Sequence, residues 1–571
     1  MASMSANLFP NTSFFTYDYL PLAATYCRTL DVIGVVDRLV PTSMGLSAGL
    51  AVQAMVLDVL SGRSPLYRVE QFWEHQDRQL LLGSNVPAHL FNDTNLGRSL
   101  DAIFEAGSSK IVTELGLAAA RVFNLDVRAV SYDTTSTNVW GEYRGSDQNP
   151  PAEGPRITYG HSKDGHPDQK QFMTELLCVE RGVPIFGSTL DGNSSDKSSN
   201  NVILSRISSL MARHGLGAGA FVYVADSAMV TLEILSNLGE TRFVSRLPEN
   251  FKVCSQTVGS AVESGEWVHI GKLAELESTR IAATYKAHET AVELEGTTYR
   301  AVVIHSDAHD RRKQKSIDNE LAKSLKKITS LAEDMQGRYF CEKDAQSAVQ
   351  TMSRMETSLH TLKASFREIV VNKRGRPPKQ GPRATETKYD LIWEVLTRDD
   401  RLQDLRERAG CFTLLTNVPS LGEEALDARA LLRTYKGQYG IESDFGFLKD
   451  PLVVNDLFLK TPSRIDALGM ILIIALLVWR LMERQMRLYL ANEGTKLPGW
   501  DNKPTDRPTT FMVSTVFGGI MVARMKGGES ALLSPLSQRQ ILFLTALGLD
   551  ERVFLDKSVV CIPDSRGRPN D

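Results

Sequence analysis

The sequence predicts an α/β fold in which a mixed sheet is flanked by helices. Three changes of pattern along the 571 residues indicate this. Residues 1–125 are helical in pattern, since LAVQAMVLDVLSG and LGRSLDAIFEAG repeat apolar residues at helical spacing and end at glycine. Residues 126–250 alternate between strand-like and helical runs, as α/β sheets do. A mostly β and helical insertion then separates this region from the last predicted helix of the core.

These patterns divide the chain into five regions. We expect a helical N-terminal domain over 1–125, the first part of the sheet over 126–250, the insertion over 251–408, the second part of the core over 409–490, and a helical C-terminal region over 491–571.

The region 126–250 supplies the strands of the core. VRAVSYDTTST is a short β-rich run ending in an acidic residue, and QFMTELLCVERGVPIFGSTLDG is a hairpin with a tight Arg-Gly turn. A capped helix follows in SSDKSSNNVILSRISSLMARHG, then the buried-type strand AGAFVYVAD, a helix, and the strand TRFVSRL. Two strands are therefore expected to end at Asp133 and Asp226, at the edge where open α/β sheets place ligands.

The insertion begins with strand-like runs and continues as a charged helical stretch over about 311–371. The segment NKRGRPPKQGPR after it is expected to be a linker. Residues 311–383 hold 17 Lys and Arg against 8 Asp and Glu, a net charge of +9 in a chain whose net charge is −3. A polyanionic partner would therefore be met by a local patch, not by a global field.

Composition favours a cytoplasmic protein. The six cysteines are scattered without a C-x-x-C pair, which fits a reducing compartment and argues against a disulfide framework or a zinc site. The start MASMSANLFPNTSFF lacks the pattern of a signal peptide. The apolar run ALGMILIIALLVWRLM at 467–482 falls short of the ~20 residues that span a bilayer, so we expect a buried core helix and no membrane.

The stretch YKGQYGIESDFGFLKD, residues 435–450, predicts one helix with two different faces. Tyr435, Gln438, Glu442 and Lys449 are separated by three, four and seven residues, which places them on one stripe of a helix. An apolar face is supplied by Ile441, Phe445 and Leu448. An amphipathic helix with a solvated polar face is the alternative interpretation.

Three carboxylates, Asp133, Asp226 and Glu442, suggest a site for hard cations. Each of them alone is more often a turn or cap residue. Together, without cysteine or clustered histidine, they suit Mg²⁺ or Mn²⁺. Two such ions can activate a water or a 3′-hydroxyl and stabilise the leaving oxygen at a phosphodiester.

The pattern resembles the DDE transposases of bacterial insertion sequences, in the group with a Tyr-Arg-Glu-Lys signature. That signature runs Tyr, two residues, Arg, three residues, Glu, six residues, Lys. Tyr435, Glu442 and Lys449 match it, and Gln438 stands where arginine is expected. The surrounding segments SYDTTS, GHSKDGHPDQKQF, DGNSSDK and VADSAM are also similar, and the resemblance spans about residues 30–550.

The resemblance implies a ribonuclease-H-like catalytic core with Asp133, Asp226 and Glu442 as catalytic metal ligands for two Mg²⁺ or Mn²⁺ ions. It implies binding of double-stranded DNA, cleavage at the element's terminal inverted repeats and joining to target DNA, in a bacterial cytoplasm and in association with the nucleoid. Because two ends must be joined in one event, we expect a homodimer on paired DNA ends. The domain 1–125 would bind DNA or dimerise. Tyr435 and Lys449 would hold phosphates of the strand that is not cut. Gln438 can still donate a hydrogen bond but lacks the charge and fork of a guanidinium.

Further DNA contacts are expected at four basic residues. Lys163, in the polar loop GHSKDG, or Arg246 could supply the charge that Gln438 lacks. KRGRPPK at 373–379 resembles an AT-hook core, and Arg374 and Arg376 would fit a narrow minor groove. The alternative for Lys163 is a purely structural turn, and the alternative for the segment 373–379 is a flexible linker.

The resemblance also implies that a base at the transposon end is flipped and stacked on an aromatic side chain. Trp267 and Trp393 of the insertion are candidates for this role, with a core position as the alternative. Three other classes of protein are also compatible with parts of the pattern: a transposase-derived DNA-binding protein that does not cut, another ribonuclease-H-like nuclease, and a glycosidase that uses two of the carboxylates. Retention of all three carboxylates disfavours the DNA-binding protein that does not cut. The basic insertion disfavours the glycosidase, which has no use for it.

Overall fold

The structure is a computed structural model that describes residues 12–564 except 142, 144–153, 195, 214, 218, 226, 228–229, 274–282, 377–380, 423, 451–458, 460 and 526–528. The chain divides into two compact units. Unit 1 comprises Met1–Ser245 and Leu431–Asp571, and unit 2 comprises Arg246–Ala430.

Helices dominate the N-terminal part of unit 1, as their periodicity predicts. They are α1 (Leu20–Thr29), α2 (Val32–Leu39), α3 (Ala48–Leu60), α4 (Val69–Glu74), α5 (Arg78–Leu82), α6 (Asp93–Ala106) and α7 (Ser108–Val122). Polar side chains cap the N-termini of four of them, since the side chains of Asp31, Ser47, Asp77 and Asn92 each accept a hydrogen bond from a backbone N–H of the first turn. The strand β1 (Thr12–Thr16) pairs with β16 (Met521–Met525) near the other end of the chain.

The C-terminal part of unit 1 is a mixture of helices and short strands. It contains α17 (Thr510–Val516), α18 (Gln538–Ala546), β14 (Leu497–Pro498), β15 (Pro504–Thr505) and β17 (Ser530–Leu532) as well as β16. Ser537 and Gln540 form a reciprocal capping box at the start of α18.

The long helix α16 (Pro462–Glu493) packs against many elements of unit 1. It packs against α1, α3, α6 and α7 and against strand β4. By length and composition it is the one helix among the described residues that could cross a membrane, but 89% of its most apolar window is buried in the fold. The prediction of a buried core helix over 467–482 is therefore confirmed.

The sheet of unit 1 is mixed, which confirms the predicted α/β class. Its strands are β2 (Ala129–Val139), β3 (Lys170–Val179), β4 (Val183–Leu190), β5 (Val222–Ala225) and β6 (Arg242–Arg246), in the order β4-β3-β2-β5-β6. The pairs β4–β3 and β3–β2 are antiparallel, whereas β2–β5 and β5–β6 are parallel. The helices α8 (Asp196–Arg213) and α9 (Leu232–Asn237) connect β4 to β5 and β5 to β6.

The β3–β4 hairpin turn contains three residues with positive φ. Glu180, Arg181 and Gly182 have φ of 44°, 65° and 119°. All ten residues of β3 are buried. The strand lies between β4, against which α7 and α16 pack, and β2, against which α15 (Tyr439–Leu448) packs.

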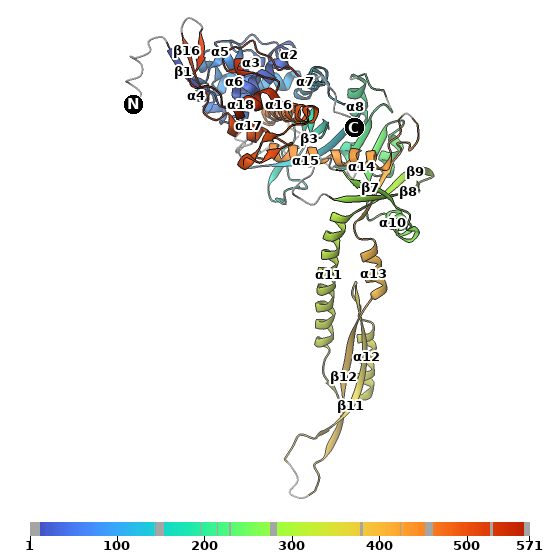
Figure 1. Cartoon of the computed structure of the whole chain (residues 1–571). Coiled ribbons are helices and arrows are strands. Elements are labelled where there is room, and N and C mark those ends of the chain that lie inside the picture. The colour runs from blue at the N-terminus through green and yellow to red at the C-terminus, as the bar shows by residue number, and fades with distance from the viewer. Residues whose placement is uncertain are drawn as a thin grey trace. The chain divides into compact units, whose positions relative to one another are not determined.

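Unit 2 is built from a second group of strands and a long arm. The strands β13 (Cys411–Thr416), β9 (Thr297–Ser306), β8 (Thr284–Leu294) and β7 (Val268–Lys272) pair in that order, and α10 (Lys252–Ser264) packs against them. The arm comprises α11 (Asp307–Asp334), β10 (Arg338–Tyr339), α12 (Glu342–Ser353), β11 (His360–Asn372), β12 (Thr385–Thr397) and α13 (Asp399–Glu407). In Figure 1, α11 and α12 lie beside the β11–β12 hairpin.

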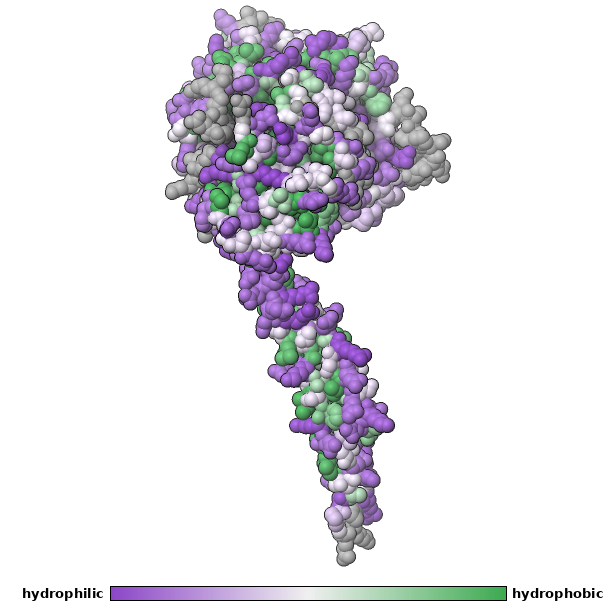
Figure 2. Space-filling model, turned by 90° about the vertical axis from the view of Figure 1, so that its right-hand side faces the viewer, coloured by the Kyte–Doolittle hydropathy of each residue, from purple (hydrophilic) through white to green (hydrophobic). Residues whose placement is uncertain are grey.

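The arm has a core of its own, made by residues from both helices and both strands. Its buried members are Ile328, Ala332, Ala348, Met352, Leu362 and Leu391. Figure 2 shows apolar patches between polar surface along the arm, and Phe340, Val370, Ile392 and Leu396 are among its exposed apolar residues.

Two expectations for the insertion are wrong. The helical stretch does not continue to 371, because α12 ends at Ser353 and the alternating residues of 360–372 form strand β11. The segment after it is not a linker between domains but the tip of the long β11–β12 hairpin, whose strands pair from His360↔Thr397 to Asn372↔Thr385.

Candidate active site beside strand β2

Asp133 lies within strand β2 and not at its end, which corrects the expectation from sequence. The strand continues to Val139 by pairing with β3, so the run of Thr and Ser after Asp133 is strand and not loop. The parallel neighbour β5 pairs with β2 only from Ala129 to Ser131. Asp133 therefore lies two residues beyond the end of that parallel pairing. Its side chain is 33% exposed.

The loop GHSKDG, residues 160–165, lies along β2 and contacts Asp133. Lys163 Nζ is 3.4 Å from Asp133 Oδ1 and donates to the Thr134 carbonyl at 2.6 Å. The Lys163 backbone N–H donates to Ser136 Oγ at 3.0 Å. Lys163 thus neutralises part of the charge of Asp133. The sequence predicts Lys163 as a DNA contact but does not predict this ion pair.

The next residue of the same loop pairs with the signature lysine. Lys449 Nζ donates to Asp164 Oδ1 at 2.7 Å and to Oδ2 at 2.6 Å. Lys449 is the C-cap residue of α15, and its backbone N–H donates to the Phe445 carbonyl. One short loop therefore provides a cation to Asp133 and an anion to Lys449.

Helix α15 presents Glu442 on its exposed side. Ile441, Phe445 and Leu448 are buried, as their spacing predicts, and Glu442 and Ser443 are exposed. Because α15 packs against β2, the elements that carry Asp133 and Glu442 are neighbours.

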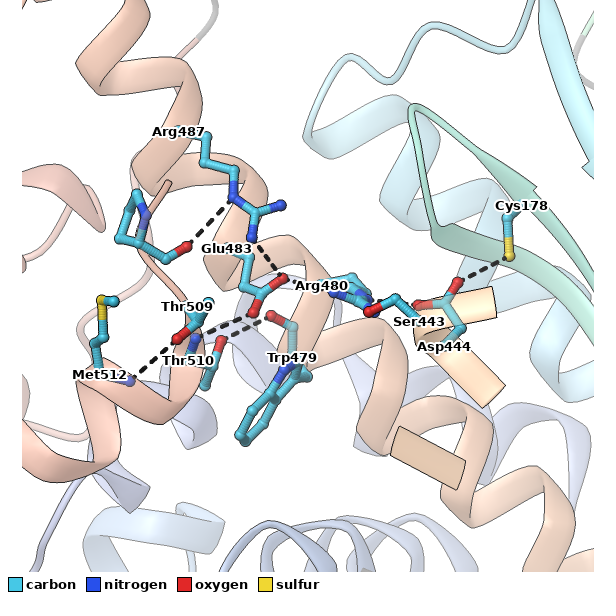
Figure 3. Close-up of polar contacts among 11 residues, drawn as sticks. Cys178, Ser443, Asp444, Trp479, Arg480, Glu483, Arg487, Thr509, Thr510 and Met512 are labelled. Carbon is cyan, nitrogen blue, oxygen red and sulfur yellow. Dashed lines mark hydrogen bonds and ion pairs between the residues drawn. The ribbon is translucent and has the colours of Figure 1, made fainter. Parts of the chain in front are cut away.

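A buried ion-pair network connects α15 to α16 (Figure 3). Asp444 is fully buried, and its Oδ1 accepts from Arg480 Nε at 2.5 Å. Arg480 also donates to Ser443 Oγ at 2.9 Å and to Glu483 Oε2 at 2.7 Å. Burial raises the pKa of Asp444 to about 7, although the charge of Arg480 opposes this increase.

The two ends of this network reach β3 and α17. Cys178 Sγ of β3 donates to Asp444 Oδ2 at 3.4 Å. Glu483 accepts from Arg487 Nη2 at 3.1 Å and from the backbone N–H of Thr510 at 3.2 Å. Arg480 thus binds two adjacent residues of α15, Ser443 and Asp444. These contacts fix the rotation of α15 about its axis, and in this orientation Glu442 is exposed.

Gly440 allows α15 to approach the β3–β4 turn. A Cβ atom at Gly440 would lie 2.0 Å from the Arg181 carbonyl oxygen, which no side chain tolerates. Gly446, in contrast, has open space around it, so of these two glycines of α15 only Gly440 is required by a close approach.

The predicted continuous helix over 435–450 is wrong. Tyr435 belongs to α14 (Ala428–Gly437), and Gln438 is the N-cap of α15. Both side chains are half-buried. The break between the two helices interrupts the stripe, so helical spacing alone does not place Tyr435 beside Glu442. Asp226 follows the last residue of β5 in the sequence and lies outside the described residues.

The other candidate DNA ligands lie in unit 2. Arg246 forms an ion pair with Glu249, and its guanidinium lies 5.4 Å from the centre of the Phe412 ring. Arg374 and Arg376 are exposed at the hairpin tip, where Gly375 has φ +150° and its carbonyl accepts from Arg383 Nη2 at 2.9 Å.

Both tryptophans are half-buried and pack against apolar clusters. Trp267 packs against the cluster of Val258, Ala261 and Val303, and Lys286 Nζ lies 4.5 Å from its ring centre. Trp393 packs against the core of the arm, which is the core position that its alternative interpretation specified.

The candidate ligands carry oxygen donors, which hard cations prefer. Asp133 and Glu442 are carboxylates with access to solvent, as Mg²⁺ or Mn²⁺ prefers. Within the described part of the chain, which lacks Asp226, no cluster of three or more His, Cys, Asp or Glu side chains is close enough to hold a metal ion.

Sequence reasoning missed Asp164, Gly440 and the pair Asp444–Arg480. The available signal was Arg480 itself, because a charged residue inside an otherwise apolar helix is buried only with a partner. Asp164 had no such signal, since it is one of several polar residues in a loop.

The fold and the site define an α/β protein with partly exposed carboxylates and paired lysines beside the central strand of a mixed sheet. In a comparison with protein families, residues 12–117 match a model described as Domain of unknown function (DUF4277). That segment covers β1 and the helices α1–α6 with most of α7, and it does not include the sheet. No curated protein matches the chain.

Proposed function

We propose that the chain is a metal-dependent DNA transposase and that its mixed sheet is a ribonuclease-H-like core. In this proposal the catalytic carboxylates are Asp133, Asp226 and Glu442. The sheet supports the proposal through its three antiparallel strands followed by two parallel ones, with Asp133 on the central strand β2.

The observation that carries the proposal is the arrangement beside β2. Asp133 of β2 and Glu442 of α15 come from elements that pack together. One short loop carries Lys163, which contacts Asp133, and Asp164, which binds Lys449. A nuclease site needs carboxylates for cations and fixed positive charge for phosphates. Both kinds of group occur here.

The metal ions would supply the activation of the attacking hydroxyl and the stabilisation of the leaving oxygen. The chain would hold them through Asp133, Asp226 and Glu442. Arg480 and Gly440 would keep α15 in the orientation that exposes Glu442. Lys449 would bind a phosphate as a point charge, and Tyr435 and Gln438 would donate hydrogen bonds to the same strand.

Double-stranded DNA is the proposed partner. The arm of unit 2 includes most of the segment 311–383, with its net charge of +9, and exposes Lys323, Lys326 and Lys327 on α11 and Arg374 and Arg376 at its tip. Positive charge on an extended surface supports phosphate contacts over many base pairs. We propose a homodimer on paired DNA ends, because two ends must be joined in one event, acting in the cytoplasm on nucleoid DNA.

Incubation of the full-length chain with duplexes carrying the ends of its own element tests this function. We expect strand cleavage with Mg²⁺ or Mn²⁺ and none with a chelator. Binding to the ends without cleavage under any metal condition would instead identify a DNA-binding protein derived from a transposase.

A further inference from the structure

The ion pair between Asp164 and Lys449 places a carboxylate where the proposed function requires a phosphate. Lys449 Nζ contacts both oxygens of Asp164, at 2.6 and 2.7 Å. A carboxylate and a phosphate both bind an ammonium group through anionic oxygens. The two anions therefore compete for the same cation.

The loop that carries Asp164 is held in place by several contacts, so the pairing does not depend on Asp164 alone. Ser162 Oγ donates to Asn138 Oδ1 at 3.4 Å, and the Asp164 backbone N–H donates to Ser162 Oγ at 3.3 Å. Lys163 is bound to Thr134 and Ser136 of β2. These contacts fix the backbone immediately before the carboxylate of Asp164.

Glycines at both ends of the loop permit this course. A Cβ atom at Gly160 would lie 2.1 Å from the Gly192 carbonyl oxygen, so only glycine fits there. Gly165 has φ +78°, a conformation that L-residues with side chains rarely adopt. Asp164 therefore sits in a turn that is anchored at both ends.

The Asp164–Lys449 pair is partly open to solvent, with side-chain exposures of 37% and 24%. An ion pair of this kind contributes little to stability, because water screens it and long side chains lose freedom. Replacing Asp164 by a phosphate oxygen at Lys449 therefore costs little free energy.

We propose that Asp164 is a competing counter-ion that occupies Lys449 in the DNA-free protein and must be exchanged for a DNA phosphate when DNA binds. This inference rests on the proposed function, since it assigns Lys449 to a phosphate. Asp164 thereby lowers the affinity of the site for any duplex. The lowering is greatest at low ionic strength, where the ion pair is strongest.

Binding of the full-length chain to a short fluorescent duplex of mixed sequence, and to one carrying an end of its element, tests the exchange. Asp164→Asn removes the charge and keeps the shape of the side chain. We expect it to bind both duplexes roughly two- to fivefold more tightly at low salt, with a smaller gain as salt rises. In a Lys449→Ala background, the same substitution should change the affinity by much less.

Asp168→Asn is the matched control, because Asp168 is an exposed carboxylate of the neighbouring segment. It removes the same formal charge, so an equal gain in this variant would show a general charge effect and overturn the exchange. Thermal unfolding of each variant confirms that it is folded.

The outcomes separate this inference from the proposed function. If the parent binds DNA, Lys449→Ala weakens binding and Asp164→Asn changes nothing, the counter-ion exchange is wrong while the function stands. If the parent binds neither duplex, the proposed function fails and the exchange fails with it.

Discussion

Arg480 of α16 lies 2.5 Å from the fully buried carboxylate of Asp444 on α15, and it also binds Ser443, the residue between Asp444 and Glu442. The polar contacts of α16 thus fix the orientation of α15, and with it the direction of the exposed face that carries Glu442. The orientation of the candidate metal ligand Glu442 therefore depends on the contacts that its neighbours Ser443 and Asp444 make with Arg480.

Arg480→Met is expected to destabilise unit 1 by about 3–5 kcal/mol, because it leaves the charge of Asp444 buried without its main partner. The measurement is the change in the thermal unfolding midpoint. Adding Asp444→Leu should recover part of the loss, since replacing both members of a buried pair by apolar residues is often neutral.

The control for this prediction is Arg552→Met. Arg552 pairs with Asp550 on the surface, with side-chain exposures of 69% and 50%, and removing such a pair should cost little. Equal losses for Arg480→Met and Arg552→Met would show that the buried network does not hold α15.

The sequence was sufficient for the elements whose pattern is local. The apolar run at 467–482 could only be a buried helix or a membrane span, and its length favoured the buried helix that α16 is. The mixed sheet followed from the alternation of runs over 126–250. Pairings between distant segments have no local pattern, so β1 with β16 could not be predicted.

Only the part of the site that depends on a local pattern could be predicted from the sequence. Spacing placed Glu442 opposite the buried residues of α15, but it could not show that Gln438 ends one helix and begins the next. The position of Asp133 within β2 depends on how far β3 continues to pair, and not on Asp133 itself. The contacts of Lys163 and Asp164 depend on how the loop folds back along β2.

The stability of unit 1 should depend on pH through Asp58 of α3. Its Oδ2 accepts from Ser64 N at 2.9 Å, and its Oδ1 is buried and has no hydrogen-bond partner among the described residues. Burial raises the pKa of Asp58 to about 6, although Ser64 and Arg63 oppose this. The ordinary pKa of Asp is about 3.9, so the folded protein binds a proton more readily than the unfolded chain.

Because the pKa is higher in the folded state, the stabilising effect of protonated Asp58 is present below about pH 4 and is lost as pH rises through about 6. Asp58→Asn should therefore gain stability relative to the parent over this range, by up to ~3 kcal/mol. Thermal unfolding midpoints of both proteins between about pH 4 and 7 measure this. A difference that stays constant with pH would show that Asp58 does not titrate there.

Lys449→Ala should weaken DNA binding about equally across sequences and lower the slope of log affinity against log salt by roughly one, because one phosphate contact is lost. A salt titration of binding measures both effects. Lys496→Ala, at an exposed lysine of the same unit, is the control. An unchanged slope in Lys449→Ala would show that this lysine does not meet phosphate.

Replacing Arg374 and Arg376 by alanine should reduce binding to A·T-rich duplexes more than to G·C-rich ones. Arginines inserted into the minor groove are sensitive to its width and potential. Both residues lie at the exposed hairpin tip, so the variant keeps the paired strands of the arm intact.

The matched control is the double substitution of Arg338 and Arg367 by alanine, which removes the same charge from the arm. Both arginines pair with Asp390, at 3.5 and 3.8 Å. If the tip variant binds both kinds of duplex as tightly as the parent, the minor-groove assignment of Arg374 and Arg376 is wrong.

Cleavage of the element's own ends by Glu442→Gln, with Asp133→Asn and Asp226→Asn beside it, tests the central claim most directly. Each change keeps the size of the side chain and removes a proposed metal ligand, so we expect end binding close to that of the parent and no cleavage with Mg²⁺ or Mn²⁺. Gel-based cleavage and binding assays on the same preparations give both results. Cleavage by Glu442→Gln at the rate of the parent would contradict the account.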